Sequence, residues 1–322
     1  MLHPPFKPLP LIKSGIKQTL VANFWPHRAD LKYNASHIIE LEDKDKLSLL
    51  EYYLIDCDQP IILMIHGLTG SHQSNYMSRL TKQLYSKYRV FRLNLRGCGT
   101  GKGLATYPYH SGRSEDIVAV LNFLISTYPN KKIHLLGFSL GANIILKMAG
   151  EFDQIFKPYL QSIIAISPPL DLHASVKKII APQNRIFNQY FTRALINSVN
   201  DSFNLSFKDK KCISKVKSVY EFDDIYTAPI CGFKNALDYY DKCSSKNFLT
   251  SITTPTLILH SKDDPLISSV GYEPKKYHNS SLSWVQTQYG GHVGFIGYTP
   301  LKFKFQWMDS LILAWLDRQN DK

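Results

Sequence analysis

The stretch Ile133-His134-Leu135-Leu136-Gly137-Phe138-Ser139-Leu140-Gly141-Ala142 decides the fold. Its first residues form a short, mostly apolar run that predicts a buried strand, and a helical stretch opens near Ala142. Between them, residues 137–141 read G-x-S-x-G, the pattern of a nucleophile elbow. A turn this tight leaves no room for side chains beside the serine, which explains the flanking glycines. The pattern predicts that Ser139 lies at the carboxyl end of a sheet, with its hydroxyl beside a helix N-terminus.

The same order of strand and helix recurs along the chain. Strands alternating with helices indicate a parallel sheet that is covered on both faces. Two alternating runs near the start predict an antiparallel hairpin on the sheet edge. The expected strands are about 36–42, about 47–55, 61–65, 90–95, 133–138, 162–166, 256–260 and 282–288, and the expected helices are 71–87, 114–128, 140–150 and 303–316.

Residues 170–250 break this rhythm. The segment is long, aromatic and mostly helical in tendency, and it lies between two predicted strands. We interpret it as a helical cap inserted into one domain that spans residues 1–322. The predicted fold class is therefore α/β, with a mostly parallel central sheet, an N-terminal antiparallel hairpin and an inserted helical cap.

Composition excludes several classes of protein. Of the 322 residues, 44% are hydrophobic and 20% are charged, which excludes a disordered chain. The five cysteines are odd in number and form no C-x-x-C pair, which argues against a disulfide framework and a zinc knuckle. No apolar run could cross a bilayer, and the first residues do not resemble a secretory signal. We expect a cytoplasmic location.

The formal net charge of +12 is spread along the chain without a dense run of lysine and arginine. Nucleic-acid binders usually concentrate such charge on a patch or an arm, so we expect no nucleic-acid partner. The charge indicates a generally basic protein, with at most weak association with an anionic membrane surface. No sequence feature specifies an oligomeric state.

A nucleophilic serine needs a base and a group that orients the base. His292 follows the last predicted strand, and Gly290 and Gly291 let its loop bend toward the elbow. The strand at 256–260 ends in Asp263 and Asp264, which compete for the third position, and we take Asp264 because it directly precedes a proline. The chain order Ser, Asp, His predicts the triad Ser139, Asp264 and His292.

An oxyanion hole needs two N–H donors. The turn after the elbow serine offers the N–H of Leu140, and the glycine-containing loop after strand 61–65 offers that of Leu68. We expect His66, in that loop, to organise the loop rather than act as the base.

With these pieces in place, the sequence resembles the α/β-hydrolase superfamily, and within it the YheT-like hydrolases, a bacterial branch related to the eukaryotic ABHD lipases. The resemblance extends over nearly the whole chain. Its markers, besides the elbow, are His66-Gly67-Leu68-x-Gly70-Ser71, Asn94-x-Arg96-Gly97-Cys98-Gly99, Tyr109-His110-Ser111-Gly112 with Asp116, Asp223, Gly232-Phe233, Asp238-Tyr239-Tyr240, Ser244 and Asp263-Asp264-Pro265.

The resemblance implies hydrolysis of a carboxylic ester, either a short-chain ester or an acylglycerol, without a metal or organic cofactor. The partner is then a small-molecule or lipid ester substrate. Two stretches depart from the family pattern. The usual Gly-His-x-Gln-Thr reads Gly15-Ile16-Lys17-Gln18-Thr19 here, and the usual Asp-Gly-Asp is replaced near Glu42-Asp43-Lys44-Asp45. The first departure puts in doubt a role of the N-terminal segment in substrate contact.

Other functions remain as alternatives. An acyltransferase would use the same triad with an alcohol acceptor, and a binding protein could use the same scaffold without catalysis. Arg96 could meet a charged head group, but we favour a salt bridge with a residue such as Asp116. Cys98 is a poor rival nucleophile because it has no evident base. The aromatic residues of the cap offer surface to an acyl chain or pack the cap onto the core: Phe187, Tyr190, Phe191, Tyr239 and Tyr240.

Overall fold

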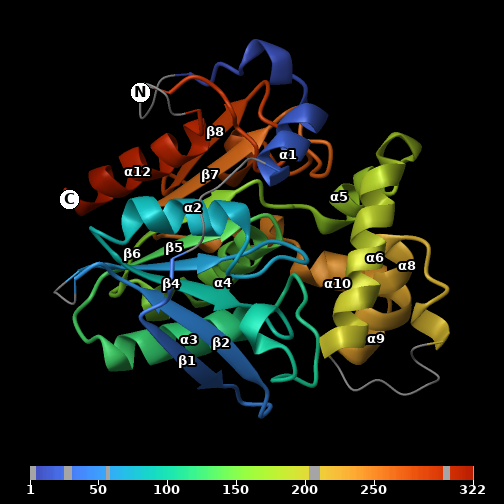
Figure 1. Cartoon of the computed structure of the whole chain (residues 1–322), viewed down its shortest axis with the longest axis horizontal. Coiled ribbons are helices and arrows are strands. Elements are labelled where there is room, and N and C mark those ends of the chain that lie inside the picture. Colours follow the sequence, from blue (N-terminus) through green and yellow to red (C-terminus); the bar gives the residue numbers. More distant parts are fainter. Residues whose placement is uncertain (1–4, 25–30, 56–58, 203–210, 300–304, 322) are drawn as a thin grey trace.

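The computed structural model describes residues 5–24, 31–55, 59–202, 211–299 and 305–321. Within these residues one sheet has eight strands in the order β1-β2-β4-β3-β5-β6-β7-β8 (Figure 1). The strands are β1 (Ala35–Glu40), β2 (Lys46–Tyr52), β3 (Ile61–Ile65), β4 (Arg89–Asn94), β5 (Ile133–Phe138), β6 (Leu160–Ile166), β7 (Thr256–Ser261) and β8 (Leu282–Thr287).

The directions of the strands confirm the predicted mixed sheet. Strands β3 to β8 pair in parallel, whereas β1 pairs antiparallel with β2 and β2 pairs antiparallel with β4. The hairpin therefore forms one edge of the sheet. Its second strand ends at Tyr52, three residues before the predicted end.

Helices cover both faces of this sheet. Alternate side chains of β3 enter two different clusters, Ile61, Leu63 and Ile65 in one and Ile62 and Met64 in the other. Because both faces are buried, the strand reads as one continuous apolar run. Helices α3 (Ser114–Thr127) and α4 (Leu140–Phe156) pack on the first cluster, and α2 (Asn75–Leu84) and α12 (Trp307–Asn320) pack on the second.

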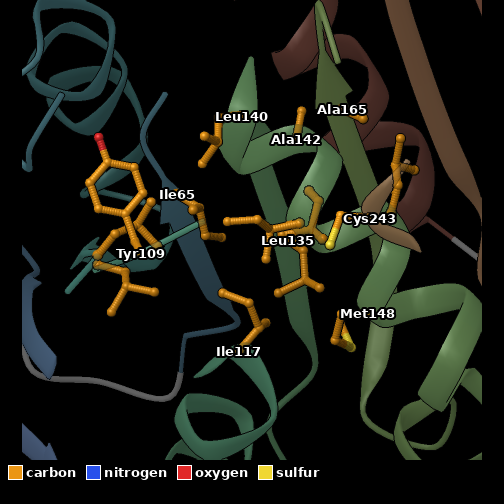
Figure 2. Close-up of a cluster of buried hydrophobic side chains, with 14 of the residues drawn as sticks. Ile65, Tyr109, Ile117, Leu135, Leu140, Ala142, Met148, Ala165 and Cys243 are labelled. Carbon is orange, nitrogen blue, oxygen red and sulfur yellow. The ribbon is translucent and has the colours of Figure 1, made fainter. Parts of the chain in front are cut away.

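The cluster under α3 and α4 lies directly beneath the elbow. Figure 2 shows Leu135 of β5 near the centre of this cluster, between Ile65 of β3 and Ala165 of β6, with Ile117 of α3 and Met148 of α4 below it in the view. All five side chains are buried. This packing fixes where β5 ends, and it therefore fixes the position of the serine that follows.

Two helices begin later than predicted. The helix expected at 71–87 runs from Asn75 to Leu84, because Ser71 and Ser74 first form a hydrogen-bonded turn. The closing helix expected at 303–316 runs from Trp307 to Asn320, and residues 303–304 lie outside the described residues. Cys57 also lies outside them.

Between β6 and β7 the chain leaves the sheet and forms a group of helices beside it (Figure 1). The Asn143 side chain of α4 donates to the carbonyls of Ser111 and Cys243 and accepts from the N–H of Ser245, which ties this group to the sheet domain. The group contains α5 (Leu172–Ile179), α6 (Arg185–Ser202), α8 (Val219–Phe222), a π turn (Asp223–Thr227), α9 (Ala228–Ile230), α10 (Ala236–Cys243) and short 3-10 turns at Pro182–Asn184, Ser245–Asn247 and Leu249–Ser251.

Four further elements lie outside the sheet and this group. They are α1 (Gly15–Phe24), α11 (Pro274–Tyr277) and 3-10 turns at Pro10–Ile12 and Gly99–Gly101. In the described part of the chain, no helix is both long and apolar enough to span a membrane.

Candidate active site

Ser139 occupies a strained turn between β5 and α4. Its backbone has φ 52° and ψ −120°, a conformation that non-glycine residues rarely adopt. A Cβ at Gly137 would lie 2.7 Å from the Cα of Ala142, and a Cβ at Gly141 would collide with the carbonyl oxygen of His66. Glycine at both positions therefore allows the turn, and the turn holds the serine hydroxyl away from the sheet.

The structure brings His292 to this serine. The loop after β8 carries the imidazole, and its Nε2 lies 2.9 Å from the hydroxyl oxygen of Ser139. Its Nδ1 lies 2.8 Å from a carboxylate oxygen of Asp264. Since a carboxylate only accepts, Nδ1 carries the proton and Nε2 accepts the hydroxyl proton of Ser139. The three predicted side chains form one hydrogen-bonded series.

Asp264 is held rigidly in this series. One carboxylate oxygen faces His292, and the other accepts from the N–H groups of Leu266 and Ile267 at 2.8 and 2.9 Å. Burial acts to raise the pKa of Asp264, but the attraction of His292 and these hydrogen bonds hold the pKa below its ordinary value. The carboxylate therefore stays ionised beside the imidazole.

The competing aspartate has a different position. Asp263 accepts a hydrogen bond from the backbone N–H of Gly291 at 2.9 Å, and another from the hydroxyl of Ser261. It therefore braces the loop that carries His292, while Asp264 contacts the imidazole itself.

The residues that carry the two predicted oxyanion donors, Leu68 and Leu140, line one cavity together with Ser139. The N–H of Gly67 donates to the Tyr76 hydroxyl and that of Thr69 donates to the Tyr109 hydroxyl, both at 2.9 Å, so the loop around Leu68 is fixed. Among the residues that the structure describes, neither the Leu68 N–H nor the Leu140 N–H donates a hydrogen bond. Both groups are available to a ligand oxygen.

His66 organises the loop beneath these donors. The ring is fully buried, its Nε2 accepts from the N–H of Leu95, and its Nδ1 donates to the carbonyl of Gly67 at 2.8 Å. Burial lowers the pKa of His66 to about 4, so the ring is neutral at physiological pH.

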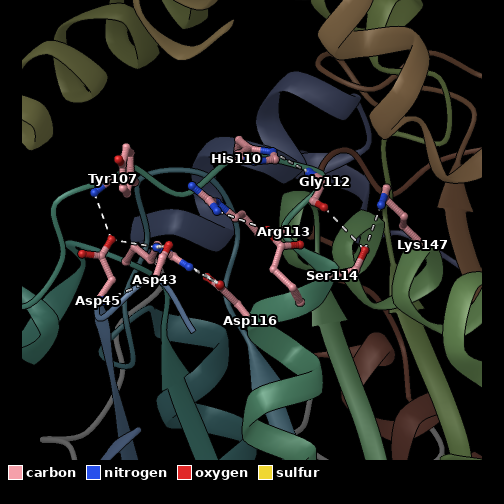
Figure 3. Close-up of polar contacts among 11 residues, drawn as sticks. Asp43, Asp45, Tyr107, His110, Gly112, Arg113, Ser114, Asp116 and Lys147 are labelled. Carbon is pink, nitrogen blue, oxygen red and sulfur yellow. Dashed lines mark hydrogen bonds and ion pairs between the residues drawn. The ribbon is translucent and has the colours of Figure 1, made fainter. Parts of the chain in front are cut away.

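The Arg96 guanidinium is fully engaged by three carboxylates. Its guanidinium makes a bidentate pair with Asp116 and also meets Asp43 at 2.6 Å and Asp45 at 2.7 Å. Figure 3 shows the three carboxylates gathered from the hairpin turn and from α3, and shows Asp45 also accepting from the N–H of Tyr107. The arginine therefore joins the hairpin to α3, and the favoured salt bridge with Asp116 is present.

Cys98 is a buried thiol, and burial raises its pKa to about 12. A thiol with that pKa is protonated at neutral pH and is a poor nucleophile. Among the described residues, no three His, Cys, Asp or Glu side chains are grouped to hold a metal ion.

Sequence reasoning missed the contribution of α1. The Thr19 hydroxyl accepts a 2.8 Å hydrogen bond from the backbone N–H of His292. Gln18 is fully buried, and its side-chain amide donates to the carbonyl of Ile296 at 2.8 Å and accepts from the N–H of Ile296 at 2.7 Å. Gly15 packs so closely on Asp263 that a Cβ would overlap its carbonyl. The sequence signal that could have indicated this contribution is Gly15–Thr19, the stretch that only partly matches the family pattern.

Two cavities meet at Ser139 and Leu68. The larger, about 510 Å³, lies between α1 and α6 and is also lined by His292. The smaller, about 90 Å³, lies under the helices between β6 and β7 and is also lined by Leu140. Most of the lining is apolar in both. Phe187, Tyr190 and Phe191 line the larger cavity, and Tyr239 and Tyr240 line the smaller.

Residues 60–297 match the family model described as the alpha/beta hydrolase fold. Three curated relatives are 28–31% identical to this chain over the aligned residues. A monoacylglycerol lipase of Saccharomyces cerevisiae is 31% identical, and the match covers 74% of this chain and 56% of the lipase. YheT of Escherichia coli, named as an esterase, is 28% identical over 80% of this chain and 76% of its own length. The phospholipase ABHD3 of Bos taurus is 30% identical over 87% of this chain and 70% of its own length. The chain thus spans little more than half the length of the yeast lipase.

A solved structure of the Pyrococcus furiosus esterase Pf2001 shares the fold. It aligns with a TM-score of 0.59 at 19% identity, over 91% of this chain and 98% of that one. The family match covers most of the chain, and the curated relatives include both YheT and an ABHD phospholipase. The chain belongs to the α/β-hydrolase fold family, as a YheT-like hydrolase related to the ABHD lipases.

Proposed function

We propose that the protein is a carboxylic ester hydrolase in which Ser139 is the nucleophile, His292 the general base and Asp264 the group that orients the base. The hydrogen-bonded series of these three side chains carries the proposal, with 2.9 Å between Ser139 and His292 and 2.8 Å between His292 and Asp264. The names of the relatives, a monoacylglycerol lipase, an esterase and a phospholipase, support the reaction class.

In the first step, the Ser139 oxygen attacks the ester carbonyl carbon while its proton moves to Nε2 of His292. The carbonyl bond electrons shift onto oxygen, and Asp264 stabilises the imidazolium that forms. The tetrahedral intermediate then collapses. Its bond to the alcohol oxygen breaks, and that oxygen takes the proton from His292, which leaves an acyl-enzyme on Ser139.

The Leu68 and Leu140 N–H groups hold the negative oxygen of that intermediate. Neither N–H donates a hydrogen bond to another described residue, and Leu68 and Leu140 line the same cavity as Ser139. Removing one such donor typically slows an enzyme by about a hundredfold to a thousandfold.

Water completes the cycle at the same groups. His292 takes a proton from the water as its oxygen attacks the acyl carbon, and returns a proton to Ser139 as the acid leaves. If an alcohol attacked instead, the product would be a new ester, which is the acyltransferase alternative.

We propose an ester with an apolar acyl chain as substrate, a short-chain ester or an acylglycerol. The apolar lining of both cavities supports this class. The helices of residues 170–250 act as the cap that closes the smaller cavity. Tyr239 and Tyr240 of the cap both line this cavity and make hydrogen bonds. The Tyr239 hydroxyl donates to the side chain of Ser111, and the Tyr240 hydroxyl donates to the carboxylate of Asp223.

Hydrolysis of p-nitrophenyl esters from acetate to palmitate tests the proposal. The wild-type protein should release p-nitrophenol and react with a fluorophosphonate probe, and Ser139→Ala should lose both while unfolding at the same temperature. Cys98→Ala, the control for the rival nucleophile, should keep both.

Absence of both hydrolysis and labelling in the folded wild-type protein would overturn the proposal in favour of a binding scaffold. Labelling with turnover only after addition of a short alcohol, and a new ester as product, would establish acyl transfer instead.

A further inference from the structure

Helix α1 buries a polar side chain and exposes apolar ones, which reverses the usual pattern of a surface helix. Its polar Gln18 is fully buried, whereas Ile16, Leu20 and Phe24 are 48%, 42% and 77% exposed. These three apolar residues are spaced four apart, so they form one stripe along the helix. Solvent-facing stripes of this kind usually mark a surface that binds something apolar.

The first turns of α6 present a second stripe. Ile186 and Tyr190, also four residues apart, are 79% and 57% exposed. Four residues of the two stripes, Leu20, Phe24, Ile186 and Tyr190, line the larger cavity that leads to Ser139. The two stripes, Ile16, Leu20 and Phe24 with Ile186 and Tyr190, thus form an apolar rim at this cavity.

The two sequence segments that carry this rim contain cations and no carboxylate side chains. Residues 1–29 contain no Asp or Glu, and neither do residues 172–200. The exposed cations Lys13 and Lys17 flank or belong to α1, and the exposed Arg185 opens α6. A surface that combines apolar side chains with cations is complementary to a lipid layer with anionic head groups.

We propose that the apolar rim docks on an anionic lipid surface and opens the larger cavity toward it. The apolar side chains enter the head-group layer, and the cations stay at the level of the lipid phosphates. A second copy of the chain fits this face less well, because two copies would bring Lys13, Lys17 and Arg185 against each other. The link to catalysis rests on the proposed ester hydrolysis, since a docked enzyme receives lipid esters directly from the layer.

Binding to vesicles tests the docking without any turnover. The Ser139→Ala protein is mixed with vesicles of pure phosphatidylcholine or of equal parts phosphatidylcholine and phosphatidylglycerol, and bound protein is measured by sedimentation. We expect binding to the anionic vesicles, weak binding to pure phosphatidylcholine, and weaker binding at high salt because salt screens the attraction.

Substitutions in the rim locate the contact. Ile16→Asp and Ile186→Asp should each weaken binding to anionic vesicles about tenfold or more, because each removes an apolar contact and adds an anion. Lys17→Glu, which changes charge alone, should weaken it as well. Ile155→Asp is the matched control, since Ile155 is 63% exposed on α4 and is not part of the rim.

Three results would overturn the proposal. The first is no binding to either kind of vesicle. The second is equal binding by the Ile16→Asp, Ile186→Asp and Ile155→Asp variants. The third is a dimer in solution that Ile16→Asp dissociates, which would assign the rim to a second copy of the chain. Because the vesicle assay needs no chemistry, failure of ester hydrolysis by the wild-type protein leaves this result unaffected.

Discussion

The backbone N–H of His292 donates a 2.8 Å hydrogen bond to the side-chain oxygen of Thr19, although 273 residues separate the two. The hydroxyl of Thr19 in turn donates to the carbonyl of Gly15 at 2.7 Å, so both of its hydrogen-bonding roles are used. Through this contact, α1 sets the position of the loop that carries the proposed base.

Thr19→Val should therefore lower kcat by about tenfold to a hundredfold with little change in KM, because small displacements of a catalytic group are costly. Valine keeps the shape of threonine and leaves the cavity wall in place, while it removes the acceptor for His292. Steady-state hydrolysis of a p-nitrophenyl ester measures both constants. Thr19→Ser restores the acceptor and should recover most of kcat; equal kcat in the valine and wild-type proteins would show that the contact has no positioning role.

Asp264→Asn should lower kcat by roughly a thousandfold or more. An amide in place of the carboxylate no longer selects the tautomer of His292 and no longer stabilises the imidazolium. Asp263→Asn is the matched control, because its amide oxygen can still accept from the N–H of Gly291, and it should lose less than tenfold. Comparison of kcat for the two variants decides the assignment, and a larger loss in Asp263→Asn would reverse it.

Arg96→Met should destabilise the protein by about 3 kcal/mol or more, because it leaves the buried carboxylates of Asp45 and Asp116 without their cation. The free energy of unfolding in urea measures the loss. Asp43→Asn should have a smaller effect, since the Asp43 side chain is 32% exposed. Arg193→Met, at an exposed position of α6, serves as the control and should be close to neutral. A neutral Arg96→Met would refute the structural role given to this network.

Stability should fall as the pH drops from about 6.5 to 4. Burial lowers the pKa of His66, His134 and His260 to about 4 in the folded protein, whereas an unfolded histidine has a pKa near 6.5. Between these values the unfolded chain binds more protons, so acid favours unfolding. Each of the three should lower the free energy of unfolding by about 2 kcal/mol between pH 7 and pH 5.

Urea unfolding at pH 7 and pH 5 measures this loss. His134→Gln removes one titrating group and should reduce the difference between the two pH values by about 2 kcal/mol. A difference as large as that of the wild-type protein would exclude His134 as a contributor.

The sequence alone predicted the parallel sheet, its edge hairpin and the elbow, because these depend on local features. A strand such as Ile61–Ile65, buried on both faces, appears as a continuous apolar run, and a tight turn at Ser139 requires glycines at fixed spacing. Local pattern could not set every element boundary, as at the helix that begins at Asn75, where side-chain bonds form a turn first.

The tertiary structure decided which of two adjacent aspartates faces His292, that the turn of the hairpin supplies two of the carboxylates around Arg96, and that Thr19 holds the loop of His292. Each of these contacts joins residues far apart in the chain. Such contacts form only when the sheet brings the ends of its strands together, and no local spacing encodes them.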